Sequence, residues 1–149
     1  MAVTVSKSTV VENIYKNFYD LINAISGFSG ICYPEFHENH DFDDKADYPV
    51  VIIGSPEVSW ESFTFGKNVL SGTIEIDIYT TTAPLTDQYT SDISNQIDSS
   101  KHTLADQGLK MVELESTSKN VVTRGNINIH MKTLIFKFMF YFDKTTSGY

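Results

Sequence analysis

The chain has 149 residues and an apolar fraction of 41%, which favours one folded domain with a proper core over a disordered chain. Its 19 acidic and 11 basic residues give a formal net charge of −8, so tight binding to nucleic acid or to an acidic membrane is not expected, because phosphate binding needs Lys and Arg. A single cysteine, Cys32, excludes an intramolecular disulfide and is expected to be a small buried side chain.

The first predicted element is a helix over about residues 9–26, after an N-terminal arm, residues 1–8, that we expect to be loose. Thr9 and Glu12 form a capping pair at its start, and Gly27 marks its end. The arm lacks the features of a signal peptide, and the apolar runs of the chain are too short for a membrane span, so we expect synthesis in the cytosol. The apolar residues of the helix recur at 3-4 spacing and predict packing on a sheet: Val11, Ile14, Tyr15, Phe18, Leu21, Ile22 and Ile25.

A polar loop over residues 33–48 follows, and it holds the strongest candidate for a metal site. His37 and His40 are three residues apart, and Asp41, Asp43 and Asp44 come close behind. Imidazole and carboxylate groups ligate zinc or manganese, which makes a metal-dependent enzyme one alternative. The pattern shows no helix and no second shell to fix the ligands, so we predict an exposed acidic loop and no metal.

Residues 50–53 predict a short buried strand, and residues 58–65 predict a second strand that ends at a hairpin turn. Three aromatic residues lie beside this turn: Trp60, Phe63 and Phe65. Aromatic side chains anchor protein interfaces, so these three are candidate contacts with a partner, with packing in the core as the alternative.

The return strand of this hairpin, residues 72–80, has the clearest alternation in the chain. Ile74, Ile76 and Ile78 share one face, while Glu75 and Asp77 lie on the other. This pattern predicts a strand with one buried face and one acidic face in water. Paired carboxylates can act in acid-base catalysis, but on a wet strand face we expect them to serve solubility.

A helix with a thin apolar stripe is predicted over residues 86–107, followed by a strand that begins at residues 111–114 and a polar connection over residues 116–125. The last strand, residues 127–142, alternates with a slip of phase near Lys132 that predicts a β-bulge. Its length and its aromatic face make Phe140 and Phe142 candidate contacts with a second subunit.

These elements predict an α+β fold, in which a single mostly antiparallel β-sheet has two helices packed on it, and in which residues 1–149 form one domain with a loose tail at residues 143–149. The glycine-rich phosphate loops, the nucleophile elbow and the paired-cysteine motif do not occur in the sequence. We therefore expect no enzyme, no catalytic residues and no cofactor.

Several segments occur in an informative order: a short N-terminal helix, YPVVIIG at residues 48–54, GTIEIDIYT at 72–80, LADQGLKMVELE at 104–115 and IHMKTLIFKFMFYF at 129–142. In order and texture, residues 10–143 resemble the tail-terminator, or tail-completion, proteins of tailed bacteriophages and related tailed viruses. These are small neck proteins that cap the tail tube and join it to the head.

This resemblance implies a ring-forming subunit, commonly six to a ring, that is made in the host cytoplasm and resides in the virion at the neck. Its implied partners are further copies of itself, the tail-tube protein and a head-completion or connector protein, while DNA passes through the ring without specific binding. Glu75 and Asp77 are then candidates to face the channel, where carboxylates repel DNA phosphate. The alternatives are a head-completion or connector-adaptor protein and a cytosolic ligand-binding α+β domain.

Overall fold

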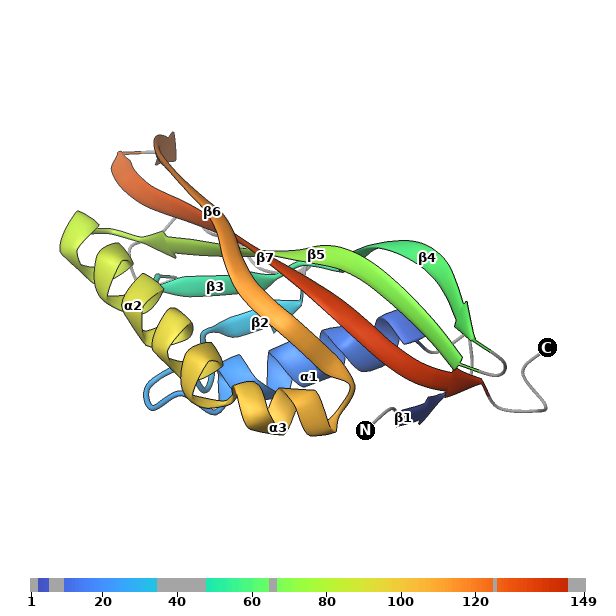
Figure 1. The fold of residues 1–149 in the computed structure, drawn as a ribbon. Helices are drawn as coiled ribbons and strands as arrows, with labels where there is room; N and C mark the ends of the chain where they lie inside the picture. The colour runs from blue at the N-terminus through green and yellow to red at the C-terminus, as the bar shows by residue number, and fades with distance from the viewer. Residues whose placement is uncertain (1–2, 6–9, 35–47, 65–66, 125, 145–149) are drawn as a thin grey trace.

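The computed structural model describes residues 3–5, 10–34, 48–64, 67–124 and 126–144. Within these ranges the chain forms one seven-stranded sheet with three helices on one side of it (Figure 1). In chain order the elements are β1 (Val3–Val5), α1 (Val10–Asn23), β2 (Cys32–Pro34), β3 (Val50–Ile53), β4 (Glu57–Thr64), β5 (Lys67–Thr80), α2 (Ala83–Ser99), α3 (Lys101–Asp106), β6 (Leu109–Arg124) and β7 (Ile127–Lys144).

The sheet is built around β5 and β7, which pair antiparallel from Lys67 opposite Asp143 to Thr80 opposite His130. On the outer side of β7 lie β6 and β1, and on the outer side of β5 lie β3 and β4, with β2 beyond β3. Only the short pairs β1–β7 and β2–β3 are parallel. The predicted α+β fold with a mostly antiparallel sheet is therefore confirmed.

The core lies between the helices and one face of this sheet. Ile74 and Ile76 of β5 stand opposite Phe136 and Leu134 of β7, and all four side chains are buried. The buried residues of α1 are Val10, Ile14, Phe18 and Ile22. The last three belong to the predicted apolar stripe, whereas Val11 of that stripe is half-buried. Each buried Phe, Ile or Leu contributes about 1.5–3 kcal/mol through removal of apolar surface from water, so these positions hold α1 on the sheet.

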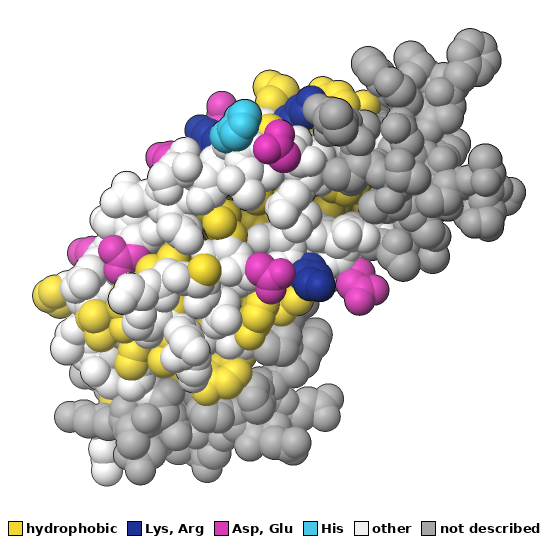
Figure 2. Space-filling view, turned by 90° about the horizontal axis from the view of Figure 1, so that it is seen from below, with side chains coloured by type: hydrophobic (Ala, Val, Ile, Leu, Met, Phe, Trp, Pro, Cys, Tyr) yellow, Lys and Arg dark blue, Asp and Glu magenta, His cyan; other side chains and the backbone are white. Residues whose placement is uncertain are grey.

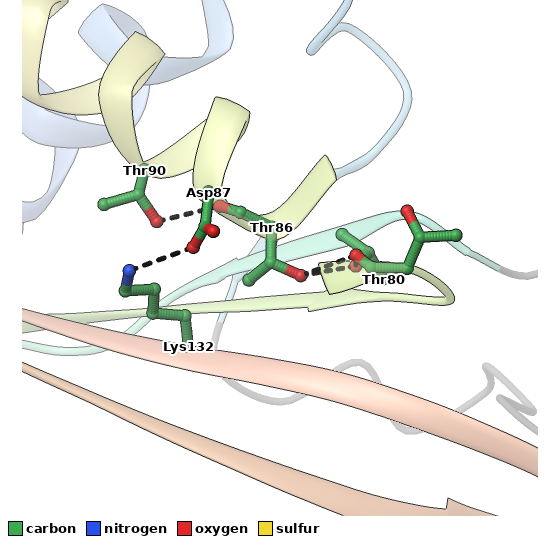
Figure 3. Close-up of polar contacts among 6 residues, drawn as sticks. Thr80, Thr86, Asp87, Thr90 and Lys132 are labelled. Atoms are coloured by element: carbon green, nitrogen blue, oxygen red, sulfur yellow. Dashed lines mark hydrogen bonds and ion pairs between the residues drawn. The ribbon is translucent and has the colours of Figure 1, made fainter. Parts of the chain in front are cut away.

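Hydrogen bonds and an ion pair join the first turn of α2 to β5 and β7 (Figure 3). The hydroxyl oxygens of Thr80 and Thr86 are 2.5 Å apart, and both side chains are buried. Thr80 also donates to the carbonyl of Thr82 at 2.6 Å, and Lys132 Nζ lies 3.2 Å from Asp87 Oδ1. Both buried hydroxyls therefore have hydrogen-bond partners. These bonds hold the first turn of α2 against the end of β5.

Several boundaries differ from those that the sequence predicts, and the return strand β5 begins at Lys67 rather than at residue 72. The second helix begins at Ala83, with Pro84 in its first turn, and it divides at Ser100 into α2 and α3. The predicted polar connection over residues 116–125 is wrong, because residues 109–124 form one long strand, β6. This segment is rich in Ser, Thr and Asn and therefore shows no alternation of apolar and polar residues. Its strand conformation comes from pairing with β7.

The predicted bulge near Lys132 is also wrong. The register of β7 with β5 advances without a shift, and the irregular steps lie in β6 instead, between Lys110 and Glu113 and between Leu114 and Ser116. The phase of the apolar pattern changes because the two halves of β7 bury opposite faces: Ile129 is buried on one face and Phe136 on the other.

Parts of both chain ends that we expected to be loose are strand. Residues Val3–Val5 form β1, in which Val3 pairs parallel with Phe142 of β7. The strand β7 itself continues to Lys144, two residues into the predicted tail. The strand β1 and the C-terminal part of β7 therefore lie side by side in the sheet (Figure 1).

Candidate interaction surface

The sheet face turned away from the helices carries an excess of acidic side chains; we call it the open face. Because Ile74, Ile76 and Ile78 point into the core, Glu75 and Asp77 of β5 lie on the open face, as predicted. Two further carboxylates reach it from the strands on either side, Glu57 of β4 and Glu113 of β6.

The two predicted channel-facing residues differ in their surroundings. Glu75 is exposed, whereas Asp77 is half-buried, and its Oδ1 accepts a hydrogen bond of 2.7 Å from the Thr133 hydroxyl across to β7. Lys137 Nζ lies 3.5 Å from Glu113 Oε2, with both side chains about half exposed. Lys110, opposite Met139, is on the same face, so the four carboxylates outnumber these two cations and the face is net negative.

Two hollows lie in the open face, with volumes of about 530 and 250 Å³. The larger crosses the sheet from Glu57 and Ser59 of β4 to Met111 and Glu113 of β6. The smaller lies between β3, β5 and β7, beside Glu75 and Asp77. Since four strands line the larger hollow, it is a concavity of the twisted sheet, and its shape suits a broad partner surface better than a small ligand.

Phe140 and Phe142 are buried in their own subunit, with 1% and 0% of their surfaces exposed. Their ring centroids lie 5.5 Å apart, and α1 covers the same half of β7, where Phe18 lies 5.8 Å from Phe138. These rings have no surface left for a neighbour, so the expectation that they contact a second copy is corrected. The aromatic face of β7 is the core of the subunit.

The other candidate residues lie largely outside the described residues. These are Phe65, the loop residues His37 and His40, and the side chains of Trp60 and Phe63. Their assignments stay predictions. The backbone of Trp60 lies in β4 opposite Leu70 of β5, which places that residue in an outer strand of the sheet.

The structure reveals one surface that the sequence reasoning missed, the outer edge of β6. Every residue from 113 to 121 is exposed, on both faces of the strand. Three of the large apolar side chains of β6 are also exposed: Met111 at 66%, Leu114 at 40% and Val121 at 53%. The signal in the sequence was the pair Gly125-Asn126 between two segments, because such a pair is typical of a hairpin turn.

Charge on the helical side of the molecule is mixed rather than gathered. Figure 2 shows this side from below, with acidic and basic side chains scattered among hydrophobic and uncharged ones.

In the described ranges the structure contains no group of three or more His, Cys, Asp or Glu residues that could hold a metal ion. Among the same residues, none of the helices has the length and apolar character needed to cross a membrane.

The fold is shared with a protein of known structure. A chain from the virion of a native gene transfer agent particle superimposes with a TM-score of 0.57 over 89% of this chain and 98% of that chain, at 12% identity. At this identity the likeness establishes the fold alone. No family model matches the chain, and no curated protein matches it.

Proposed function

We propose that this chain is a structural protein of a phage-like virion, and specifically a tail terminator that forms a ring at the neck. The observation that carries the proposal is the likeness to a virion chain over 98% of that chain's length. The order of segments along the sequence supports the same assignment independently. In this role the chain caps the tail tube and joins it to a head-completion or connector protein.

The acidic open face suits the wall of a channel for DNA. Each subunit has a net charge of −8, so six copies would carry about −48. A negative wall containing Glu75 and Asp77 repels phosphate and lets DNA slide rather than adhere. This orientation of the sheet is part of the proposal, and an inner ring surface that is basic would contradict it.

The proposal is tested by locating the chain in particles. Virions purified from cells that produce this chain with a short peptide tag after Tyr149 are labelled with gold-conjugated antibody and viewed by electron microscopy. A tail terminator predicts gold at the junction of head and tail, and on the head-proximal end of free tails. Gold on tail-free heads points to a head-completion protein instead, and unlabelled particles contradict a virion role.

A further inference from the structure

We propose that residues 116–124, on the outer edge of β6, pair with the outer edge of β4 in a second copy of this chain. The sheet then continues from one subunit into the next. This inference rests on the proposed ring-forming function and supplies the interface that it needs. The occupant of both edges is the same protein, because the two edges match in length and have complementary charge.

Strand β6 is unusually exposed. A strand normally buries at least one face, yet residues 113–121 are exposed on both. In Figure 1 the paired ends of β6 and β7 rise clear of the helices. A hairpin without such cover is marginally stable in water, so a second neighbour for this strand supplies stability that the subunit alone does not.

Residues 116–124 contain neither a proline nor a β-bulge, two of the devices that block strand pairing. Two register shifts disturb β6 before Ser116, but from Ser116 opposite Ile135 to Arg124 opposite Ile127 the register is regular. The segment contains no proline and no shift, and such an edge is a template for another strand. The Val121 N–H donates a hydrogen bond of 2.9 Å to Asn120 Oδ1 of the same strand, and an added strand would compete for this donor.

The two edges carry charges of opposite sign. Residues 116–124 contain Lys119 and Arg124 and no carboxylate, in a chain with 19 acidic residues. The strand β4 has eight residues, which include Glu57 and Glu61 and no cation. In the described part of the sheet β4 pairs only with β5, so its far side is an outer edge. Opposite charges across paired strands stabilise the pair.

The symmetry that follows is that of a ring. Pairing β6 with β4 joins two different surfaces, and repeated head-to-tail contacts of this kind close into a ring when the rotation permits. A two-fold dimer would instead pair β6 with β6, which brings like charges together. The same edge-to-edge geometry places the open faces of successive subunits on one side of the assembly.

The test is disulfide trapping between two single-cysteine variants. Ser59→Cys places a thiol on the exposed outer strand β4, and Asn120→Cys places one on β6; both positions are exposed. The buried Cys32 is retained in each variant. Under mild oxidation we expect a 1:1 mixture to form a cross-linked dimer, and each variant alone to form at least about tenfold less. The matched control replaces Ser59→Cys with Asn95→Cys on the exposed side of α2 and should give no cross-link.

Charge reversal tests the same contact without cysteine. We expect Lys119→Glu to weaken self-association about five- to tenfold, and Lys101→Glu, the same charge change on α3, to leave it unchanged. Adding Glu57→Lys to Lys119→Glu should recover part of the loss. Association is measured by sedimentation, with circular dichroism to show that each variant is folded.

The contribution of backbone hydrogen bonds to the proposed β6–β4 contact is tested by Val121→Pro. Proline is tolerated at an edge position whose N–H points outward, so the subunit should fold while the added strand is blocked.

The inference is overturned if the cysteine mixture gives no cross-link, or if Asn120→Cys alone cross-links as well as the mixture does. Loss of the cross-link with gold still at the neck would refute only this interface. A cross-link in a protein absent from virions would refute only the proposed function.

Discussion

The thiol of Cys32 shows how burial controls chemistry at a single residue. The side chain lies in β2 and is 5% exposed, and burial raises its pKa from 9.0 to about 12. The thiolate is the reactive form of cysteine, so this thiol is inert near neutral pH. A lone cysteine next to the apolar Ile31 predicted a small buried side chain, and the structure confirms it.

A prediction follows for stability in alkali. Because the pKa of Cys32 is higher in the folded state than in the unfolded state, its contribution is complete below pH 9 and is lost as the pH rises toward 12. The free energy of unfolding should fall by up to about 1.4 kcal/mol per pH unit above pH 9 from this group. The measurement is urea denaturation from pH 8 to pH 10.5, with Cys32→Ala as the matched control that lacks the slope. Equal slopes in the two proteins would contradict the account.

At the scale of an element, β5 is the strand on which the fold depends, because it pairs with β3, β4 and β7. Gly72 lies at the point where β4 and β7 approach it most closely. A Cβ at this position would clash with the carbonyl oxygen of Glu57 and lie 3.1 Å from Cζ of Phe138. Glycine is therefore required here for close approach of the neighbouring backbone.

We expect Gly72→Ala to destabilise the protein by about 1–3 kcal/mol, because β4 must shift away from β5. The matched control is Ser71→Ala on the neighbouring residue, which points to the open face and should change the stability by less than about 0.5 kcal/mol. Chemical denaturation of both variants measures the difference. Stability unchanged in Gly72→Ala would mean that β4 is not held as closely as the structure shows.

The elements that the sequence predicts well are those with strong alternation. Ile74, Ile76 and Ile78 mark β5, and the Phe residues of β7 mark its buried face. By contrast, residues 116–124 of β6 have little apolar pattern, since they bury no face in the subunit. Their strand conformation comes from pairing with β7, which periodicity does not report.

Part of the candidate interaction surface was predicted, because its strand β5 shows strong alternation. Alternation placed Glu75 and Asp77 on a polar face, and the structure confirms that placement. Alternation in the sequence does not distinguish a strand face covered by helices of the same chain from one covered by a neighbouring chain. Phe140 and Phe142 were therefore assigned to an interface. The phase slip in β7 was misread because burial of opposite faces by the two halves gives the pattern of a bulge.

At the scale of the whole molecule, the subunit has the features of a building unit. Its fold is that of a chain from a gene transfer agent virion, one sheet face is acidic and uncovered by helices, and two outer strands have complementary charge. A small ligand site would instead place convergent polar groups in an enclosed pocket. The proposed role in assembly would account for these properties together.

The most direct measurement of that claim is the native mass of the purified chain at high concentration, combined with negative-stain electron microscopy. The account predicts closed rings with a central hole, and a ring of six 16.8 kDa subunits would weigh about 101 kDa. Val121→Pro should reduce the ring population. A 16.8 kDa monomer at every concentration, or a dimer without a hole, would contradict the account.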